Sequence, residues 1–480
     1  MSRWNQLFAK QPPTGPSPIP RIQVLGTGAL IAMGIGATIG SGIFVTTGQV
    51  AANVAGPGVM LSYLVAGFAC VLAALCYAEF AALHPSGGSA YSYAYATMGE
   101  LLAWIIGWDL VLEYGVAGSI VAVGWSEHLV QLFQSIGVAI PPWVISPVNF
   151  PAAFIMVVVT YILVRGVEES AKMNALMVVV KIGIVLFVIL VGAWFVLPEN
   201  WTNVPHPNNP SGSAFLPFGW GGVMTGAAMV FFAFIGFDAV STHAEEAINP
   251  GRSLPRGILV SLAICTVLYI AVSAVLVGMV PWPEIAPQAP VAAAFERAGM
   301  PWAAVIIDLG ALAGMTSVLL VTFSGQARIF RAMARDGLLP KGLFASEHPK
   351  FGTPHRSLIL TGSIAGLMAA LTPPDILLEM VSIGTLLAFA IVCLAVMILR
   401  NTHPDFVRPF RCPWVYVVAP LGIIVNVAMM AALPFETWLR LVIWLVIGLV
   451  LYFAYGFRHS GTREVVSDLQ SRPAEPDPSN

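Results

Sequence analysis

GIGATIGSGIF, from Gly34 to Phe44, interrupts the first long apolar stretch of the chain with glycines and polar residues. A second interruption of the same kind is FFAFIGFDAV, from Phe231 to Val240. Backbone that leaves the helix inside a bilayer must line a protein-enclosed cavity, because an unpaired N–H or C=O group in hydrocarbon costs several kcal/mol. The two stretches therefore predict a pair of discontinuous transmembrane helices with a binding site between them.

The composition around these stretches is that of a polytopic, all-α membrane protein. Of the 480 residues, 58% are hydrophobic and only 10% are charged, and many apolar runs are long enough to cross a bilayer. We predict twelve transmembrane helices, which begin near residues 25, 57, 100, 150, 173, 219, 257, 300, 356, 375, 414 and 436.

Basic residues are distributed so as to indicate the orientation of the chain. If the N-terminus is cytoplasmic, all but three of the 22 Lys and Arg residues fall on cytoplasmic segments, the exceptions being Lys181, Arg297 and Arg440. We therefore predict a multi-pass protein of the inner (cytoplasmic) membrane with both termini inside. Residues 1–24 have no secretory signal and form a cytoplasmic segment, and the polar tail 459–480 is expected to be disordered.

Five predicted spans begin between the first interruption and the second, and an odd number inverts the second unit relative to the first. This predicts a five-plus-five inverted repeat, about 25–197 and 219–400, in a core spanning 25–400 with discontinuous helices 1 and 6. Residues 401–458 add two further helices. The arrangement is typical of a transporter, whereas a channel filter sequence such as TVGYG is absent from the chain.

Several motifs together resemble the amino acid, polyamine and organocation transporter superfamily, and within it the bacterial relatives of the cationic amino acid transporters. They are GATIGSGIF, GWDLVLEYGVA, FFAFIGFDAVSTHAEEAINPGRSLPRGI and SGQARIFRAMARDGLLP. The resemblance implies uptake or exchange of amino acids by alternating access. A sensor that keeps the pocket without transport is the less favoured alternative.

An amino acid substrate brings a carboxylate and an ammonium whose hydration the site must replace. The N-terminal end of a half-helix near Ser41 and Gly42 offers free N–H groups to the carboxylate, and carbonyls before the interruption suit the ammonium. We predict that Ile39, Gly40, Ser41 and Gly42 bind substrate. The alternative is a helix-packing surface, which the spacing of Gly36 and Gly40 also satisfies.

At the second interruption the resemblance implies substrate contacts from Phe231, Ala233, Phe234 and Ile235. The aromatic rings can close over an apolar substrate side chain. Ordinary packing of each ring is the alternative.

Three ionisable residues, Glu113, Lys181 and Asp238, are predicted to lie inside the spans, where a charge is costly. The resemblance places Lys181 where sodium-coupled relatives hold a cation, and we hypothesise that this lysine couples transport to protons. A permanently charged anchor on carbonyls of the first span is the alternative. Glu113 and Asp238 can pair internally, relay protons or receive a cationic substrate, and for Asp238 helix capping remains equally open.

The remaining polar residues are assigned to gating or to structure. The resemblance implies a gating contact for Glu79, with a solvated helix-end carboxylate as the alternative. The run AEEAINPGRSLPRGI is expected to form a cytoplasmic loop.

No enzyme motif, cofactor site or metal site is indicated by the sequence, and the five cysteines form no CxxC. The expected partners are an amino acid, protons and membrane lipid, without nucleic acid, and the sequence does not specify a small membrane subunit. A glycine-lined pocket favours broad specificity for neutral amino acids, with a cationic amino acid or a polyamine as the alternative substrate.

Overall fold

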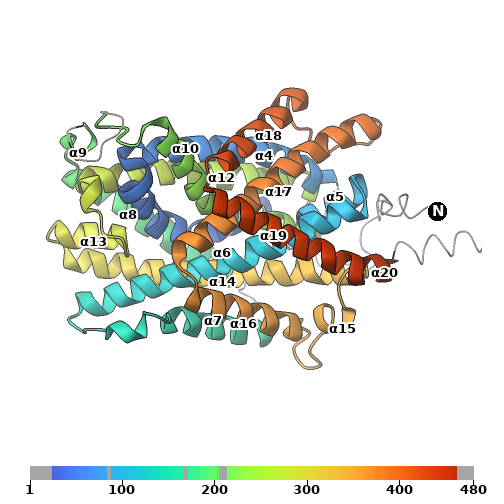
Figure 1. Ribbon diagram of the computed structural model, residues 1–480, viewed down its shortest axis with the longest axis horizontal. Coiled ribbons are helices and arrows are strands. Elements are labelled where there is room, and N and C mark those ends of the chain that lie inside the picture. Colours follow the sequence, from blue (N-terminus) through green and yellow to red (C-terminus); the bar gives the residue numbers. More distant parts are fainter. Residues whose placement is uncertain (1–23, 84–87, 167–170, 203, 205–212, 462–480) are drawn as a thin grey trace, which may run out of the picture.

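The computed structural model describes residues 24–83, 88–166, 171–202, 204 and 213–461, and every regular element among them is a helix (Figure 1). The predicted N-terminal segment 1–24 lies outside the described residues apart from Val24. The predicted disordered tail 459–480 lies outside them apart from residues 459–461.

Within the described residues, eight helices are long and apolar enough to cross a membrane. Their principal segments are α4 (Val59–Leu83), α6 (Glu100–Ser135), α8 (Ala171–Gly192), α10 (Gly219–Val230), α12 (Pro250–Met279), α14 (Pro301–Arg335), α17 (Pro374–Thr402) and α19 (Phe435–Leu451). Shorter apolar helices are α2 (Thr27–Thr38), α7 (Phe150–Val164), α16 (His355–Leu371) and α18 (Val415–Ala431). The chain is therefore a polytopic membrane protein of helical architecture.

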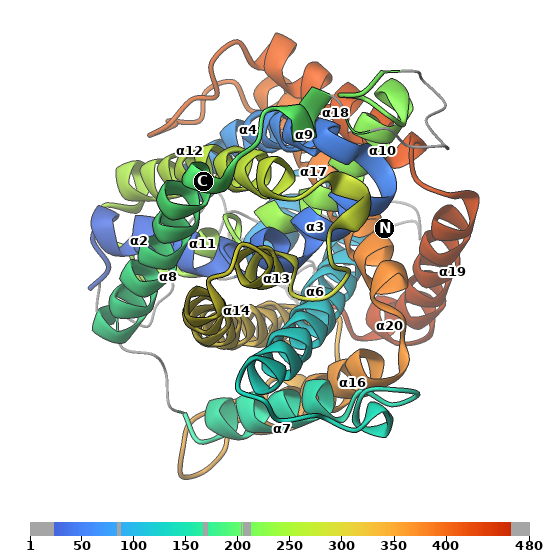
Figure 2. The same ribbon diagram turned by 90° about the vertical axis from the view of Figure 1, so that its left-hand side faces the viewer.

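Helices α6 and α14 run along the long axis of the molecule in Figure 1 and pack closely against each other. Helix α17 packs on α6 and α18, while α12 packs on α2 and α4. Helices α7 and α16 lie side by side at the periphery in both views (Figures 1 and 2). The interrupted segments are enclosed by these packed helices.

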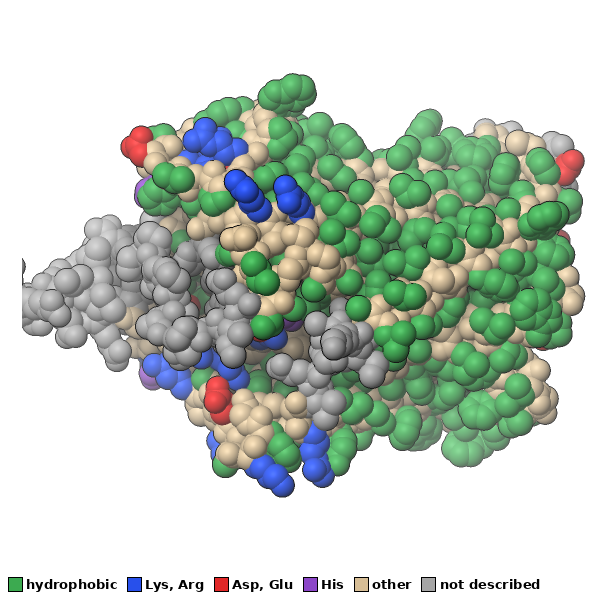
Figure 3. Space-filling view, turned by 180° about the vertical axis from the view of Figure 1, so that it is seen from behind, with side chains coloured by type: hydrophobic (Ala, Val, Ile, Leu, Met, Phe, Trp, Pro, Cys, Tyr) green, Lys and Arg blue, Asp and Glu red, His purple; other side chains and the backbone are tan. Residues whose placement is uncertain are grey.

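The outer surface is apolar along most of its length, and Lys and Arg side chains gather at one end of the visible face (Figure 3). Large side chains that point outward include Val157, Val179, Leu190, Ile424 and Val450, each more than half exposed. Such a surface is costly in water and stable in hydrocarbon. The apolar surface is therefore that expected of a chain with several membrane-spanning helices.

Both ends of the described chain lie near the same end of α14. The N–H groups of Val24 and Leu25 donate to the Glu246 carbonyl, and Arg328 of α14 pairs with the Glu246 carboxylate at 3.4 Å. At the other terminus, the Gly461 N–H donates to the carbonyl of Asp336, which directly follows α14.

The last described residues are also tied to the start of α6. The buried Glu100 carboxylate accepts hydrogen bonds from Tyr95 (3.0 Å) in helix α5 (Ser89–Thr97) and from Tyr452 (2.9 Å). It also accepts a hydrogen bond from Ser460. This contact joins two segments that are far apart in the sequence.

The expected loop AEEAINPGRSLPRGI is wrong in its second half, because α12 begins at Pro250. Pro250 stands in the first turn, where a missing N–H costs nothing, and the preceding Asn249 turns the chain with φ 51°. Pro255 is accommodated close to the same end of the helix. Prolines near a helix start were thus mistaken for loop residues.

Candidate functional site

The first interruption separates α2 from the helical segment that follows it. Helix α2 ends at Thr38, Ile39 is extended with ψ 104°, and helical backbone resumes at Ser41 before the π-helical turn Gly42–Thr46. Ile39, Gly40, Ser41 and Gly42 are all buried. The first N–H groups of the resumed helix have no intrahelical acceptors.

The second interruption begins where α10 gives way to the 3-10 turn Phe231–Phe234. Ile235 is extended with ψ 132°, Gly236 has φ 122°, and the chain becomes helical again at α11 (Ala239–Thr242). A φ of this value favours glycine strongly. Phe231, Ala233 and Phe234 are buried, and Ile235 is partly exposed.

The two interruptions pack directly against each other through glycine. A Cβ atom on Gly42 would lie 2.4 Å from Ala233 Cβ and 2.5 Å from Ala233 Cα. A Cβ atom on Gly236 would lie 2.7 Å from the carbonyl carbon and oxygen of Ala37. Each glycine therefore allows one broken helix to touch the backbone of the other.

Two tyrosines, which no sequence motif marks, hydrogen-bond to backbone carbonyl groups at the interruptions. The Tyr269 hydroxyl of α12 lies 2.8 Å from the carbonyl oxygens of both Thr38 and Ala233. The Tyr63 hydroxyl of α4 donates to the Gly42 carbonyl at 3.0 Å and lies 2.7 Å from the Thr47 hydroxyl. A tyrosine beside a helix break carries no motif, so only the tertiary contact reveals its role.

Other polar atoms at the first interruption have no protein partner. The hydroxyl oxygens of Thr38 and Ser41 are buried and make no hydrogen bond within the described residues. Buried hydroxyls are normally hydrogen-bonded, so unpartnered ones mark a place where a ligand or ordered water is expected. Together with the free N–H groups of the resumed helix, they form a concentration of hydrogen-bonding groups suited to a carboxylate.

The aromatic rings of the second interruption point in different directions. Phe231 packs edge-on against Phe389 of α17, with ring centroids 5.6 Å apart. Phe234 packs against Tyr269 at 5.3 Å and Tyr63 at 6.2 Å. Phe234 thus contacts the two tyrosines that bind the freed carbonyls, and Phe231 faces α17.

Lys181 extends from α8 to the first interrupted helix. Its Nζ donates to the Gly36 carbonyl at 2.6 Å, and only 1% of the residue is exposed. A Cβ atom on Gly314 of α14 would lie 3.2 Å from Lys181 Cε, so this glycine makes room for the lysine stem. The structure therefore brings the predicted lysine to the last turn of α2, next to the break.

Asp238 and Glu113 lie in the same buried region but differ in their contacts. The Asp238 carboxylate accepts the Gly236 N–H at 3.1 Å and the Tyr114 hydroxyl at 2.8 Å. Asp238 lies close enough to act electrostatically on Glu113, and the Thr385 hydroxyl lies beside the Glu113 carboxylate.

The prediction of three ionisable residues inside the spans was too low. Asp109, His128 and Asp308 are also buried in α6 and α14, and the His128 ring and the Asp308 carboxylate pair at 2.6 Å. The spacing of Asp109 and Glu113, four residues apart on one helix, was available in the sequence as a signal.

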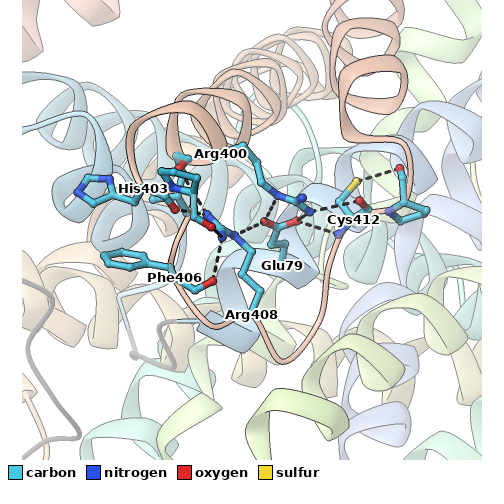
Figure 4. A network of polar contacts seen from close by, with 9 residues as sticks. Glu79, Arg400, His403, Phe406, Arg408 and Cys412 are labelled. Atoms are coloured by element: carbon cyan, nitrogen blue, oxygen red, sulfur yellow. Dashed lines mark hydrogen bonds and ion pairs between the residues drawn. The ribbon is translucent and has the colours of Figure 1, made fainter.

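Glu79 lies away from the interruptions, near the end of α4 (Figure 4). Arg400 donates two hydrogen bonds of 2.7 Å to its carboxylate, Arg408 pairs with it at 3.1 Å, and the Cys412 N–H donates at 2.7 Å. The Glu79 side chain is fully buried. The buried carboxylate thus fastens α4 to the end of α17 and to the connection between α17 and α18.

Among the described residues, no group of three or more His, Cys, Asp or Glu side chains could hold a metal ion. The fold and the site define a helical, multi-pass membrane protein with two interrupted helices packed around unpartnered hydrogen-bonding groups. Such an arrangement is typical of secondary transporters.

The comparison with known proteins agrees with this class and specifies the family. The sequence profile described as "Amino acid permease" matches residues 25–454. The chain belongs to this amino acid permease family, within the amino acid, polyamine and organocation superfamily, and the resemblance noted from its motifs is confirmed.

Similar relatives include bacterial and plant proteins. A branched-chain amino acid permease of Bacillus subtilis is 45% identical over 450 residues, which cover 92% of each chain. A methylthioribose transporter of the same organism is 46% identical over 92% of this chain and 93% of the relative. A vacuolar cationic amino acid transporter of Arabidopsis thaliana is 40% identical over 78% of this chain and 63% of the relative. These proteins are permeases and transporters, so the chain is a transport protein and not an enzyme.

Proposed function

We propose that this chain moves amino acids across the cytoplasmic membrane by alternating access. The observation that supports this most directly is the packing of the two interruptions, which brings Gly42 against Ala233 beside the unpartnered hydroxyls of Thr38 and Ser41. In this proposal the N–H groups from Ser41 onward bind the substrate carboxylate, and carbonyls at the interruptions bind its ammonium.

The architecture in this proposal has twelve spans. The eight long helices are joined by α7, α16 and α18, and α2 forms the first half of span one. The turn at Gly56, with φ 60°, and Pro57 separates span one from α4. Spans one to five and six to ten form inverted repeats, and both termini are cytoplasmic. The contacts of Leu25 and Gly461 near the same end of α14 support an even number of crossings.

Substrate size in this proposal follows from the residues at the break. Gly42, Ala233 and Gly236 leave little side-chain bulk at the contact between the two interruptions, and Gly40 faces Val318 of α14. Ile39, Phe231, Phe234 and Ile235 supply apolar surface around it. We therefore favour broad specificity for neutral amino acids such as alanine.

A cationic amino acid or a polyamine is the second candidate substrate, since buried carboxylates lie near the break and some relatives are cationic amino acid transporters. Competition between alanine and arginine for uptake separates the two substrate classes.

Proton coupling without sodium is assigned to Lys181, with Glu113 and Asp238 as acidic counterparts. The lysine ammonium on the Gly36 carbonyl supplies positive charge next to the break, where a bound cation would otherwise stabilise freed carbonyls. Loss of its proton would weaken this contact, because a neutral amine is a poorer hydrogen-bond donor than an ammonium. In this proposal the protonation state of Lys181 therefore affects the position of α2, and the position of α2 affects the opening of the substrate site.

Glu79 is assigned to gating in the same scheme. Its ion pairs with Arg400 and Arg408 join α4 to the end of α17 and to the segment that follows α17. A movement of α4 relative to α17 would separate the buried Glu79 carboxylate from its two arginine partners.

The test is uptake of radiolabelled alanine by proteoliposomes as a function of external pH, in wild type and in Lys181→Met. We expect wild-type uptake to rise with an inward proton gradient and the variant to lose that dependence. The variant Gly183→Ala is a matched control on α8, since a Cβ at Gly183 meets no atom within 4 Å. Uptake that is as pH-sensitive in Lys181→Met as in wild type would exclude the proton role of Lys181.

A further inference from the structure

Asp109 and Glu113 are two buried carboxylates of one helix, of which the scheme above uses only Glu113. They stand four residues apart on α6, so they share one helix face and are separated by about 6 Å along the axis. Both residues are fully buried. Neither Asp109 carboxylate oxygen makes a hydrogen bond within the described part of the chain, and the hydroxyl of Thr385 is the polar group beside the Glu113 carboxylate.

The face that carries them is packed against α17. A Cβ atom on Gly384 would lie 3.0 Å from Asp109 Oδ1, so the Asp109 carboxylate points at this glycine. The Ser382 hydroxyl of α17 is buried and also unpartnered. The Thr385 hydroxyl lies beside Glu113 and donates to the Val381 carbonyl at 2.9 Å. Two buried carboxylates of α6 thus face α17, one beside Gly384 and one beside Thr385.

No cation compensates these groups. Neither carboxylate forms an ion pair with Lys, Arg or His within the described residues. Two titratable groups of other elements lie near Glu113, namely Asp238 after the second interruption and Tyr77 of α4. Asp109 and Tyr114 are its titratable neighbours on α6 itself. All of them are acids, so their ionised forms repel a charge on Glu113.

An isolated charge buried at membrane depth costs at least about 2.5 to 3.5 kcal/mol even on insertion scales. Two neighbouring carboxylates in such a place do not both ionise, because desolvation and mutual repulsion act in the same direction. A proton on one of them removes a charge and supplies an O–H donor. The ligand that this pair lacks is therefore a proton.

We propose that Asp109 and Glu113 form a proton-holding couple that carries the coupled proton between the substrate site and the end of α6 near Glu100. Asp109 lies nine residues from Glu100, or about 14 Å along the helix, and Glu113 lies one turn closer to Asp238. The couple rests on the proposed proton-coupled transport and adds a second proton site, distinct from Lys181.

Infrared spectroscopy of the purified protein in lipid nanodiscs tests the couple without transport. Spectra at neutral pH without sodium are compared for wild type, Asp109→Asn, Glu113→Gln and the double variant. The C=O stretching band of a protonated carboxylic acid should be present in wild type and be reduced by the equivalent of one carboxyl group in the double variant. The exposed Asp375→Asn on α17 should leave the band unchanged.

Glu113→Asp protects the test against a folding defect in the neutral variants, because it keeps both carboxyl groups and should shift the band without removing it. No difference between wild type and the double variant would mean that both groups are ionised, and would overturn the couple. A band that disappears when sodium is added would assign the site to a metal cation and would also overturn it.

Transport separates this inference from the proposal on which it rests. Proton-driven alanine uptake should fall about tenfold in Asp109→Asn, with the wild-type rate kept in Asp375→Asn. If wild type shows no proton-driven uptake, the proposed coupling fails while the infrared result still decides where a proton is held. If wild type is proton-driven and Asp109→Asn is unaffected, the couple is not on the proton route and the inference fails.

Discussion

The replacement Gly42→Ala tests whether the contact between the two broken helices forms the substrate site. The added Cβ would lie 2.4 Å from Ala233 Cβ and 2.5 Å from Ala233 Cα. Because carbon atoms pack at about 3.5 to 4.0 Å, the half-helices must separate by roughly 1 Å. Flexible side-chain motion does not relieve this clash, since Ala233 Cα belongs to the backbone.

The expected magnitude follows from that displacement. Overpacking of a close contact costs about 1 to 3 kcal/mol, which corresponds to a factor of about 5 to 150 in an equilibrium constant. We expect the dissociation constant for alanine to rise by this factor. The same clash should also lower thermal stability, partly offset by the roughly 1 kcal/mol by which helix propensity favours alanine over glycine.

Binding of radiolabelled alanine to the purified protein measures the effect, and thermal unfolding in the same detergent checks the fold. Gly221→Ala on α10 is the matched control, since a Cβ there meets no atom within 4 Å, and it should bind alanine like wild type. A Gly42→Ala protein that is folded and binds alanine with unchanged affinity would refute the placement of the site between the two interruptions.

Two further replacements test a contact at this site and the buried ion pairs of Glu79. Tyr269→Phe removes the hydroxyl from the Thr38 and Ala233 carbonyls. It should weaken alanine binding about 5- to 150-fold, because an unpaired buried polar group costs about 1 to 3 kcal/mol. A dissociation constant for alanine within twofold of wild type would contradict this. Glu79→Ala should destabilise the folded protein by about 3 to 5 kcal/mol, because it leaves two arginines without their buried partner. The control Glu284→Ala breaks an exposed pair with Arg297 and should cost about 0 to 1 kcal/mol. Equal shifts of the two variants in thermal unfolding would mean that the Glu79 ion pairs do not stabilise the fold.

The interruptions were accessible to sequence reasoning because they break an apolar pattern. Glycine and polar residues inside a long apolar run are costly in lipid, so their positions near Gly40 and Gly236 could be read directly, and the structure interrupts the helices there. The ionisable Lys181 stood out for the same reason, and its contact with span one was among the alternatives. Polar, charged and glycine residues inside a long apolar run can therefore be recognised from the sequence alone.

Contacts between distant segments were not accessible in this way. Tyr63 and Tyr269 look like ordinary core aromatics until the fold brings their hydroxyls to backbone carbonyls at the interruptions. Arg400 and Arg408 follow the orientation rule for basic residues, so their pairing with Glu79 adds no separate signal. The helix start at Pro250 was missed because proline is compatible with both a loop and a first helical turn.

The central claim is that this protein moves amino acids with protons and without sodium. Accumulation of radiolabelled alanine in sodium-free proteoliposomes, with and without an inward pH gradient, tests it most directly. The account predicts alanine accumulation above equilibrium only when the gradient is present, with loss of accumulation when a protonophore is added. Rapid exchange against internal alanine without any gradient-driven accumulation would contradict it and would make the protein an exchanger.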